Sequence, residues 1–122
     1  MPHLYYVLDL RDDPALITEY EDWHRPERIW PDIVDSIRAA GIRELEILRA
    51  GNRLLMVMDV ADDFSADSKA AADADNPRAQ AWEQLMWKFQ QPLPFARPGE
   101  KWVRMVSMFS LQQVLSMRIQ PS

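Results

Sequence analysis

The sequence predicts an α+β fold in which helices cover one face of a single antiparallel sheet. Short aromatic and aliphatic runs, typical of strands, flank two stretches of helical periodicity. Two of these runs are separated only by a turn, as in a hairpin. The resulting order is β-α-β-β-α-β, the ferredoxin-like plan with a four-stranded antiparallel sheet. The length of 122 residues suits one domain, so we expect residues 1–122 to fold together.

The first strand is expected over Leu4–Leu10, "LYYVLDL", and a helical region follows it. Asp13 can cap the helix, and the proline after it suits the first helical position. Pro26 should kink or break the helix, after which helical periodicity resumes. Gly41 is a plausible left-handed residue at its end. We therefore expect one long, bent helical region before the second strand.

The second half of the chain predicts the remaining strands and the second helical layer. Strands are expected at Glu44–Leu48 and Arg53–Val60, joined by a hairpin loop "RAGN". The alanine-rich stretch Ser65–Asp75 suggests a small helix, and Asn76 with its following proline starts another. A proline-rich loop then leads to the last expected strand, Lys101–Leu111, "KWVRMVSMFSL".

Two of the predicted strands are apolar on both faces. "LLMVM" at Leu54–Met58 does not alternate, and the last strand would place Val106 and Met108 on one face and Met105 and Phe109 on the other. An uncovered apolar face forgoes roughly 25 cal/mol per Å². We therefore expect a homodimer packed sheet to sheet, which closes a barrel-like interior. The alternative is a monomer whose own side chains and loops cover the face.

Composition excludes several classes of function. The net charge is -5, with 14 basic residues scattered among 19 acidic ones, which argues against a nucleic-acid partner. Three widely spaced glycines cannot build a phosphate-binding loop, and the absence of cysteine removes thiol chemistry. The longest apolar run has five residues, too short for a membrane span. With no evident secretory signal, we expect a cytoplasmic protein without a membrane partner.

The stretch "YEDWHRPERIWP" holds the main candidate for chemistry. Tyr20 and His24 are four residues apart, so on a helix they share one face and can meet the same ligand. A histidine titrates near pH 6.5 and can exchange protons close to neutral pH. The alternative is that His24 has a purely structural role and caps the break before Pro26.

Trp30 and Trp82 lie on the core stripes of their helices, yet indole rings also stack on sugars.

Other chemistries find less support. The two histidines lack metal-ligand spacing and cysteine is absent, so no metal site is predicted. No serine lies in a nucleophile elbow. The strand carboxylates Asp9, Glu44, Glu46 and Asp59 could form an acid–base pair, although strand carboxylates more often face solvent. The chemistry that remains is metal-free acid–base catalysis on a small polar molecule.

Trp23 and Trp87 lie off the core stripes and are candidates for the dimer interface.

Three stretches together resemble the L-rhamnose mutarotase family: "EYEDWHRPERIWPDIVDSIRAAGI", "LEILRAGNRLLMVMDV" and "NPRAQAWEQLMWKF", within Leu4–Leu111. The resemblance implies a dimeric ferredoxin-like α/β barrel. It also implies cofactor-independent interconversion of the α and β anomers of a 6-deoxy-hexose, a monosaccharide substrate. By the same resemblance His24 matches the catalytic acid, Tyr20 a sugar-binding tyrosine, and Trp82 the first tryptophan of a sugar-binding pair.

The sequence departs from the family pattern at three places. Glu83 stands where the second tryptophan of the pair is expected, Leu45 replaces an aromatic substrate contact, and extra residues follow His24. These changes place Glu83 in the sugar pocket and make L-fucose a candidate beside L-rhamnose. The general base stays open among Tyr20, a strand carboxylate and a water. Two other functions also stay open: a dimeric α/β-barrel monooxygenase, and a non-catalytic sugar-binding module.

Overall fold

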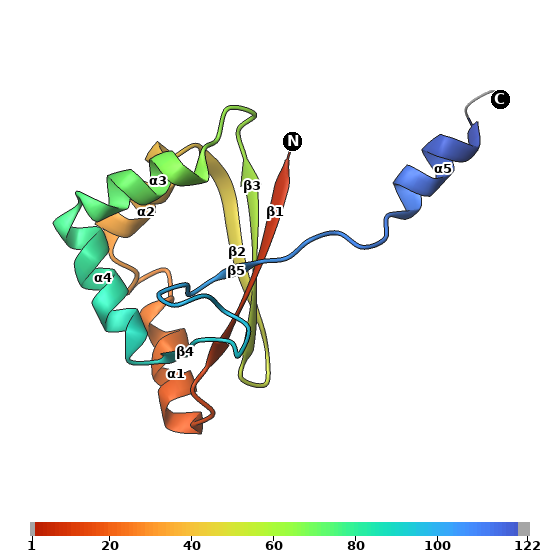
Figure 1. Cartoon of the computed structure of the whole chain (residues 1–122). Coiled ribbons are helices and arrows are strands. Elements are labelled where there is room, and N and C mark those ends of the chain that lie inside the picture. Colours follow the sequence, from red (N-terminus) through yellow and green to blue (C-terminus); the bar gives the residue numbers. More distant parts are fainter. Residues whose placement is uncertain (1, 120–122) are drawn as a thin grey trace.

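A computed structural model describes residues 2–119 of the chain (Figure 1). Its elements, in order, are β1 (His3–Leu10), α1 (Pro14–Trp23), α2 (Pro31–Ala39), β2 (Ile42–Ala50), β3 (Arg53–Val60), α3 (Ala66–Ala74), α4 (Pro77–Trp87), β4 (Gln90–Gln91), β5 (Val103–Arg104) and α5 (Leu111–Ile119). The expected hairpin and the expected helix in the alanine-rich stretch are therefore both present.

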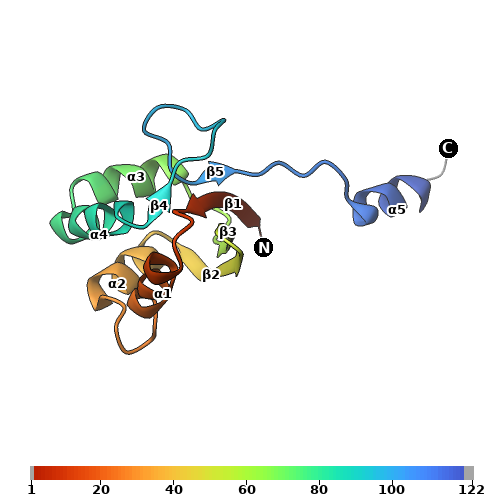
Figure 2. The same cartoon turned by 90° about the horizontal axis from the view of Figure 1, so that it is seen from below.

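The strands form one antiparallel sheet in the order β2-β3-β1-β4, and β5 also pairs with β1. The pairs of α1 with α2 and of α3 with α4 lie on the same side of this sheet (Figures 1 and 2). The α+β, ferredoxin-like class is thus confirmed. The last strand of that plan is divided here into β4 and β5, and the intervening loop leaves the sheet. That residues 1–122 make one domain stays a prediction.

The helix signals of the sequence work as expected. The Asp13 side chain accepts hydrogen bonds from the backbone of Ala15 and Leu16, and the Asn76 side chain does the same at the start of α4. Each cap satisfies backbone donors that have no partner within the helix. Gly41 has φ +88°, the left-handed conformation that lets the chain turn from α2 into β2.

The first helical region consists of two helices, where one bent helix was expected. α1 ends at Trp23, residues 24–30 form turns and bends, and α2 begins at Pro31. The cause lies in the prolines. Pro26 disfavours helical geometry at the residue before it, and Pro31 suits the first position of a new helix. His24 consequently lies at the C-terminal cap of α1.

The prediction of a strand over Lys101–Leu111 was wrong for most of its length. Only Val103 and Arg104 pair with β1, extended by a hydrogen bond from the Met105 amide to the Tyr5 carbonyl. Residues 105–110 have no regular structure, and Leu111 starts α5, which stands apart from the sheet and the other helices in both views (Figures 1 and 2). A strand needs a neighbouring strand along its length, and the single chain offers none here.

The core lies between the sheet and the helices. Its fully buried side chains come from β1, β3 and the turn after α4: Leu8, Leu10, Leu54 and Phe89. Tyr20 joins this cluster, and Trp23 packs against it. The position of Trp23 is therefore explained by the core of one chain, without the dimer contact that the sequence suggested for it.

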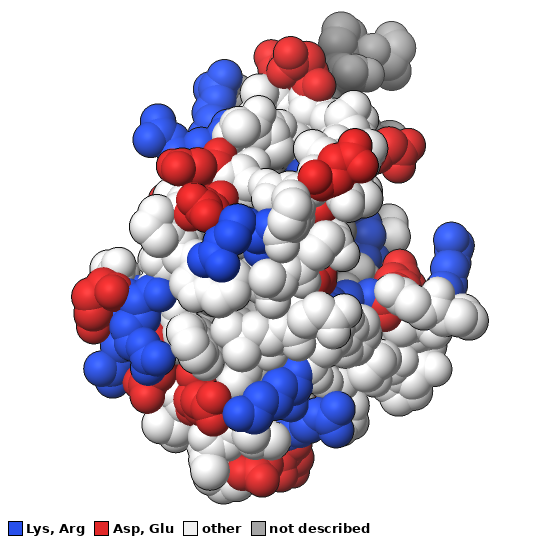
Figure 3. Space-filling model, turned by 90° about the vertical axis from the view of Figure 1, so that its left-hand side faces the viewer, with Lys and Arg blue, Asp and Glu red and all other residues white. Residues whose placement is uncertain are grey.

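Charged side chains of both signs are interspersed over the helical face of the molecule (Figure 3). This distribution follows the mixed charge pattern of the sequence. Within residues 2–119, no helix has the length and apolar character needed to cross a membrane. The cytoplasmic location stays a prediction.

Candidate active site

Two neighbouring hollows lie between the helices and the sheet. The larger, about 730 Å³, is lined by Tyr20, His24 and Trp82 together with residues of α2, β2 and β3, and we call it the His24 hollow. The smaller, about 410 Å³, is lined by Glu83, Trp102 and residues of α2, α3 and the sheet, and we call it the Glu83 hollow. Their shared lining residues are Ile33, Ile37, Leu45, Met56 and Trp82.

The hydrogen bonding of His24 fixes its tautomer. Its Nδ1 lies 2.7 Å from the backbone carbonyl oxygen of Tyr20. A carbonyl oxygen only accepts hydrogen bonds, so Nδ1 carries a hydrogen and donates it. In the neutral ring the lone pair is then on Nε2, which has no hydrogen-bond partner within the described chain. The ring therefore offers a proton acceptor to a molecule in the hollow.

Burial also decides the charge of this ring. It lowers the pKa of His24 below the ordinary 6.5, because a buried site disfavours the charged imidazolium, and the hydrogen bond to Tyr20 opposes this only in part. The imidazole is therefore neutral at pH 7. His24 caps a helix end, as its structural interpretation required, and it also lines the hollow.

Tyr20 packs against the His24 ring and exposes little of its own side chain to the hollow. The two rings lie 4.4 Å apart between centroids, and only 3% of Tyr20 is exposed. Burial raises the pKa of Tyr20 to about 12, although a hydrogen bond from the Gln90 side chain works against the shift. The Gln90 oxygen has no partner in the described chain, so the amide nitrogen makes this bond. Tyr20 is thus a neutral phenol at physiological pH.

Trp82 forms an aromatic wall beside His24. Its ring centroid lies 5.5 Å from that of His24 and 5.1 Å from that of Trp30, both in edge-on arrangements. Such arrangements are favourable for aromatic pairs and hold the indole in place. The structure therefore brings Tyr20, His24 and Trp82 to one hollow. Glu83 follows Trp82 on α4 and lines the neighbouring hollow instead.

The four carboxylates predicted in strands all belong to the outer face of the sheet. Glu44 and Glu46 of β2 border the His24 hollow, but they lie opposite Asp59 and Val57, so their side chains point away from it. Asp9 lies on the far face of the sheet, where Arg53 holds both its oxygens at 2.8 and 3.1 Å. Asp59 has a buried oxygen without a hydrogen-bond partner in the described chain. Neither of these two aspartates lines a hollow.

The sequence reasoning missed two charged pairs near the hollows. Glu21 and Arg49 both line the His24 hollow and form an ion pair at 3.2 Å. Glu83 is paired with Lys101 at 2.6 Å. Both pairs join residues far apart in the chain, so no local pattern announces them. Among residues 2–119, no group of three potential ligands could hold a metal ion.

Comparison with known proteins identifies the family. The family model for L-rhamnose mutarotase matches residues 4–111. The chain belongs to the L-rhamnose mutarotase family. Since mutarotases interconvert the anomers of sugars, it is a carbohydrate isomerase.

Individual relatives agree with this assignment. An L-fucose mutarotase of Xanthomonas campestris pv. campestris is 53% identical over 118 residues, which cover 97% of this chain and 94% of the relative. A UPF0734 protein of Dictyostelium discoideum is 31% identical over 109 residues, 86% of each chain.

Solved structures share the fold. The crystal structure of an L-rhamnose mutarotase from Formosa agariphila matches with a TM-score of 0.65 at 18% identity, over 91% of this chain and 99% of that one. Tetracenomycin F2 cyclase from Streptomyces glaucescens, a type-II polyketide cyclase, matches with a TM-score of 0.59 at 12% identity, over 90% and 98%. At these identities the likeness concerns the fold alone, so the cyclase carries no argument for polyketide chemistry.

Proposed function

We propose that the protein interconverts the α and β anomers of a 6-deoxy-hexose without a cofactor, and that L-fucose is its preferred substrate. The observation that carries this proposal is the neutral imidazole of His24, whose Nε2 is free at the wall of a hollow that also holds Trp82. The choice of L-fucose over L-rhamnose rests on the 53% identical relative named an L-fucose mutarotase.

His24 moves a proton between two oxygens of the sugar. Nε2 accepts the proton of the anomeric hydroxyl as the bond between the anomeric carbon and that oxygen becomes a carbonyl. The bond to the ring oxygen breaks, and the ring oxygen receives the proton back from Nε2. Both oxygens are bonded to the same carbon, so one nitrogen serves both. After rotation of the aldehyde, the reverse steps close the ring on its other face.

The surroundings of His24 supply the binding. The sugar lies with its C–H face on the indole of Trp82, which bounds both hollows. The Tyr20 ring packs against the imidazole, with 4.4 Å between the ring centroids. Its pKa of about 12 makes the phenol a poor proton carrier at pH 7, so Tyr20 orients His24 and contacts the sugar without acting as the base. Glu83 accepts hydrogen bonds from sugar hydroxyls at the adjoining hollow.

The assembly that we propose is a homodimer packed through the outer face of the sheet. Residues that alternate with the core positions point to this face: Tyr5, Val7, Leu55 and Val57, with Val103 paired beside Val7. None of α1–α4 covers it (Figures 1 and 2). The segment after β5 adds exposed Met105, Val106, Met108 and Phe109. Large apolar surfaces of this kind mark interfaces, and a second copy of the same sheet fits this one.

Exchange NMR tests the proposed activity directly. The α and β anomer signals of L-fucose and of L-rhamnose are followed by saturation transfer, with and without catalytic amounts of the protein. Faster exchange for L-fucose than for L-rhamnose supports the proposal. A folded protein that binds sugar and leaves exchange at the spontaneous rate is a binding module, and oxygen uptake with a quinol in place of exchange indicates a monooxygenase.

A further inference from the structure

Lys101 makes an ion pair at the edge of the Glu83 hollow that the proposed reaction does not yet use. Its Nζ lies 2.6 Å from Glu83 Oε1. The lysine side chain exposes only 10% of its surface, whereas that of Glu83 exposes 46%. The ammonium is thus the buried partner and the carboxylate the accessible one, the reverse of a surface pair in which a lysine extends into solvent.

The ammonium is held by a second group from the same helix. Lys101 Nζ lies 4.6 Å from the centroid of the Trp87 ring, and Trp87 follows Glu83 by one helical turn on α4. A cation over an indole face is attracted to it, more strongly when water is excluded. Burial lowers the pKa of Lys101, but the carboxylate of Glu83 favours the charged form. Two groups of α4 therefore fix the position of this cation.

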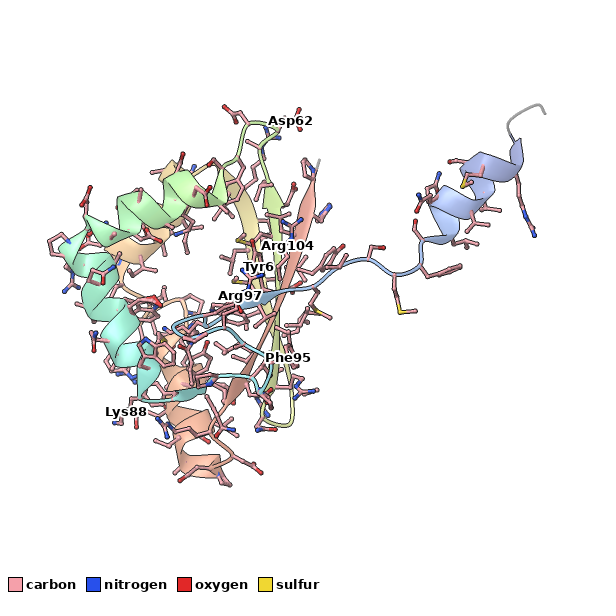
Figure 4. All side chains as sticks on the ribbon, viewed as in Figure 1. Tyr6, Asp62, Lys88, Phe95, Arg97 and Arg104 are labelled. Atoms are coloured by element: carbon pink, nitrogen blue, oxygen red, sulfur yellow. The ribbon has the colours of Figure 1, made fainter. Side chains whose placement is uncertain are left out.

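The chain on either side of Lys101 is also fixed. Lys101 lies near the end of the loop between β4 and β5, in which Arg97 and Glu100 are joined by two hydrogen bonds (Arg97 is labelled in Figure 4). The next residue, Trp102, packs against the core and lines the Glu83 hollow. These contacts hold Lys101 in place, so that its ammonium group binds one oxygen of the Glu83 carboxylate.

The second oxygen of Glu83 is left for a ligand. Lys101 occupies Oε1, and Oε2 has no hydrogen-bond partner within the described chain. A carboxylate oxygen only accepts hydrogen bonds, and sugar hydroxyls donate them. Trp82 and Glu83 both line the Glu83 hollow, so a sugar that lies on the indole and extends into this hollow can reach the carboxylate.

We propose that Lys101 is a positioning residue that holds Glu83 so that Oε2 accepts a hydroxyl of the sugar, and that this contact sets the preference between 6-deoxy-hexoses. This inference rests on the proposed function. L-Fucose and L-rhamnose differ in the orientation of the hydroxyls at C2 and C4. An acceptor fixed in one place bonds one orientation and leaves the other unpaired, which is a strong source of discrimination.

The test compares sugar preference in matched variants. Exchange rates are measured over a range of concentrations of both sugars for the wild type, Lys101→Met, Lys101→Arg, Glu83→Gln and the double variant of Lys101→Met with Glu83→Gln. Lys88→Met is the control: Lys88 also pairs with a glutamate, Glu19 at 3.3 Å, but it lies at the C-terminal end of α4 (Figure 4) and lines neither hollow. Thermal unfolding of each variant shows which ones fold.

Lys101→Met is expected to raise KM for the preferred sugar about tenfold and change kcat less, so that the preference shrinks, while the less preferred sugar is affected little. Lys101→Arg keeps a cation and is expected to restore the preference. The double variant Lys101→Met with Glu83→Gln is expected to be no worse than either single variant. The pH profile should not move, because His24 sets it. Lys88→Met should match the wild type throughout.

Equal losses for both sugars, or an unchanged preference, would show a structural role for Lys101 and overturn the inference. If Lys101→Met does not fold, Glu83→Gln decides: a preference equal to that of the wild type overturns it as well. A wild type that exchanges neither sugar overturns the proposed function together with this inference. An active wild type whose preference survives both changes overturns the inference alone.

Discussion

The imidazole of His24 is bonded to the helix that carries it: Nδ1 donates to the carbonyl oxygen of Tyr20, one turn earlier, at 2.7 Å. This bond satisfies a carbonyl at the end of α1 that would otherwise lack a partner. It also leaves the lone pair on Nε2, at the hollow. The end of the helix and the proton acceptor are therefore set by the same contact.

Replacement of His24 should remove most of the catalysis. We expect His24→Ala to lower the rate of anomer exchange by roughly 10²–10⁴-fold, the usual contribution of a positioned acid–base group. His3→Ala is the matched control, because His3 is exposed at the start of β1 and lines neither hollow. Exchange NMR measures both variants, and circular dichroism checks their folding. A folded His24→Ala protein with the wild-type rate would exclude His24 from proton transfer.

The pH dependence of the reaction should follow the neutral form of His24. Because burial lowers the pKa of this group below 6.5, the neutral form predominates at neutral pH and the ring becomes charged in acidic solution. The rate at low sugar concentration, corrected for spontaneous mutarotation, should therefore be flat at neutral and alkaline pH and fall as the solution is acidified through the lowered pKa. A rate that rises on acidification would mean that the imidazolium is the active form.

Tyr20→Phe should separate stability from catalysis. The substitution removes the hydroxyl that Gln90 bonds and leaves a second buried group on Gln90 without a partner. We expect the free energy of unfolding in urea to fall by about 1–3 kcal/mol. The exchange rate should stay within a few-fold of the wild type, because the ring still supports His24. A loss of rate as large as that of His24→Ala would instead assign the proton transfer to the phenol.

Local sequence signals predicted much of the fold. The caps at Asp13 and Asn76 and the turn at Gly41 depend on a few adjacent residues, and each appears where the sequence places it. The pair of Tyr20 and His24 is local in the same sense. The Lys101–Glu83 contact joins a loop to a helix, and only the packed structure brings these two residues together. The spacing of residues along the sequence does not predict such a contact.

The strand predicted over residues 105–111 is absent because a local signal is not sufficient to form a strand. The segment "MVSMFSL" has strand-like composition, but β propensity is realised only beside another strand. A single chain provides that neighbour as far as Met105, whose amide reaches the Tyr5 carbonyl. Beyond it the apolar side chains of Val106, Met108 and Phe109 are exposed. The composition of this segment is therefore better explained by an assembly than by the isolated chain.

The proposed dimer gives the last prediction. Leu55 lies on the outer sheet face between Val7 and Leu48, and its neighbours Leu54 and Met56 point to the interior. A lysine at this position would bury a charge between two sheets with only apolar residues opposite it, which is costly. We expect Leu55→Lys to shift the mass in solution from dimer to monomer, as measured by sedimentation or light scattering.

Two further variants test the same interface, one by a second substitution within it and one as a control outside it. Phe109→Asp changes an exposed residue outside the core and should weaken the dimer while the fold remains intact. Ala72→Lys places the same charge as Leu55→Lys on the exposed surface of α3, in the helical layer that lies across the sheet from the proposed interface, and should leave the mass unchanged (Figure 1). A monomeric wild type, or a dimer that survives both interface substitutions, would mean that loops and side chains of one chain cover the apolar face.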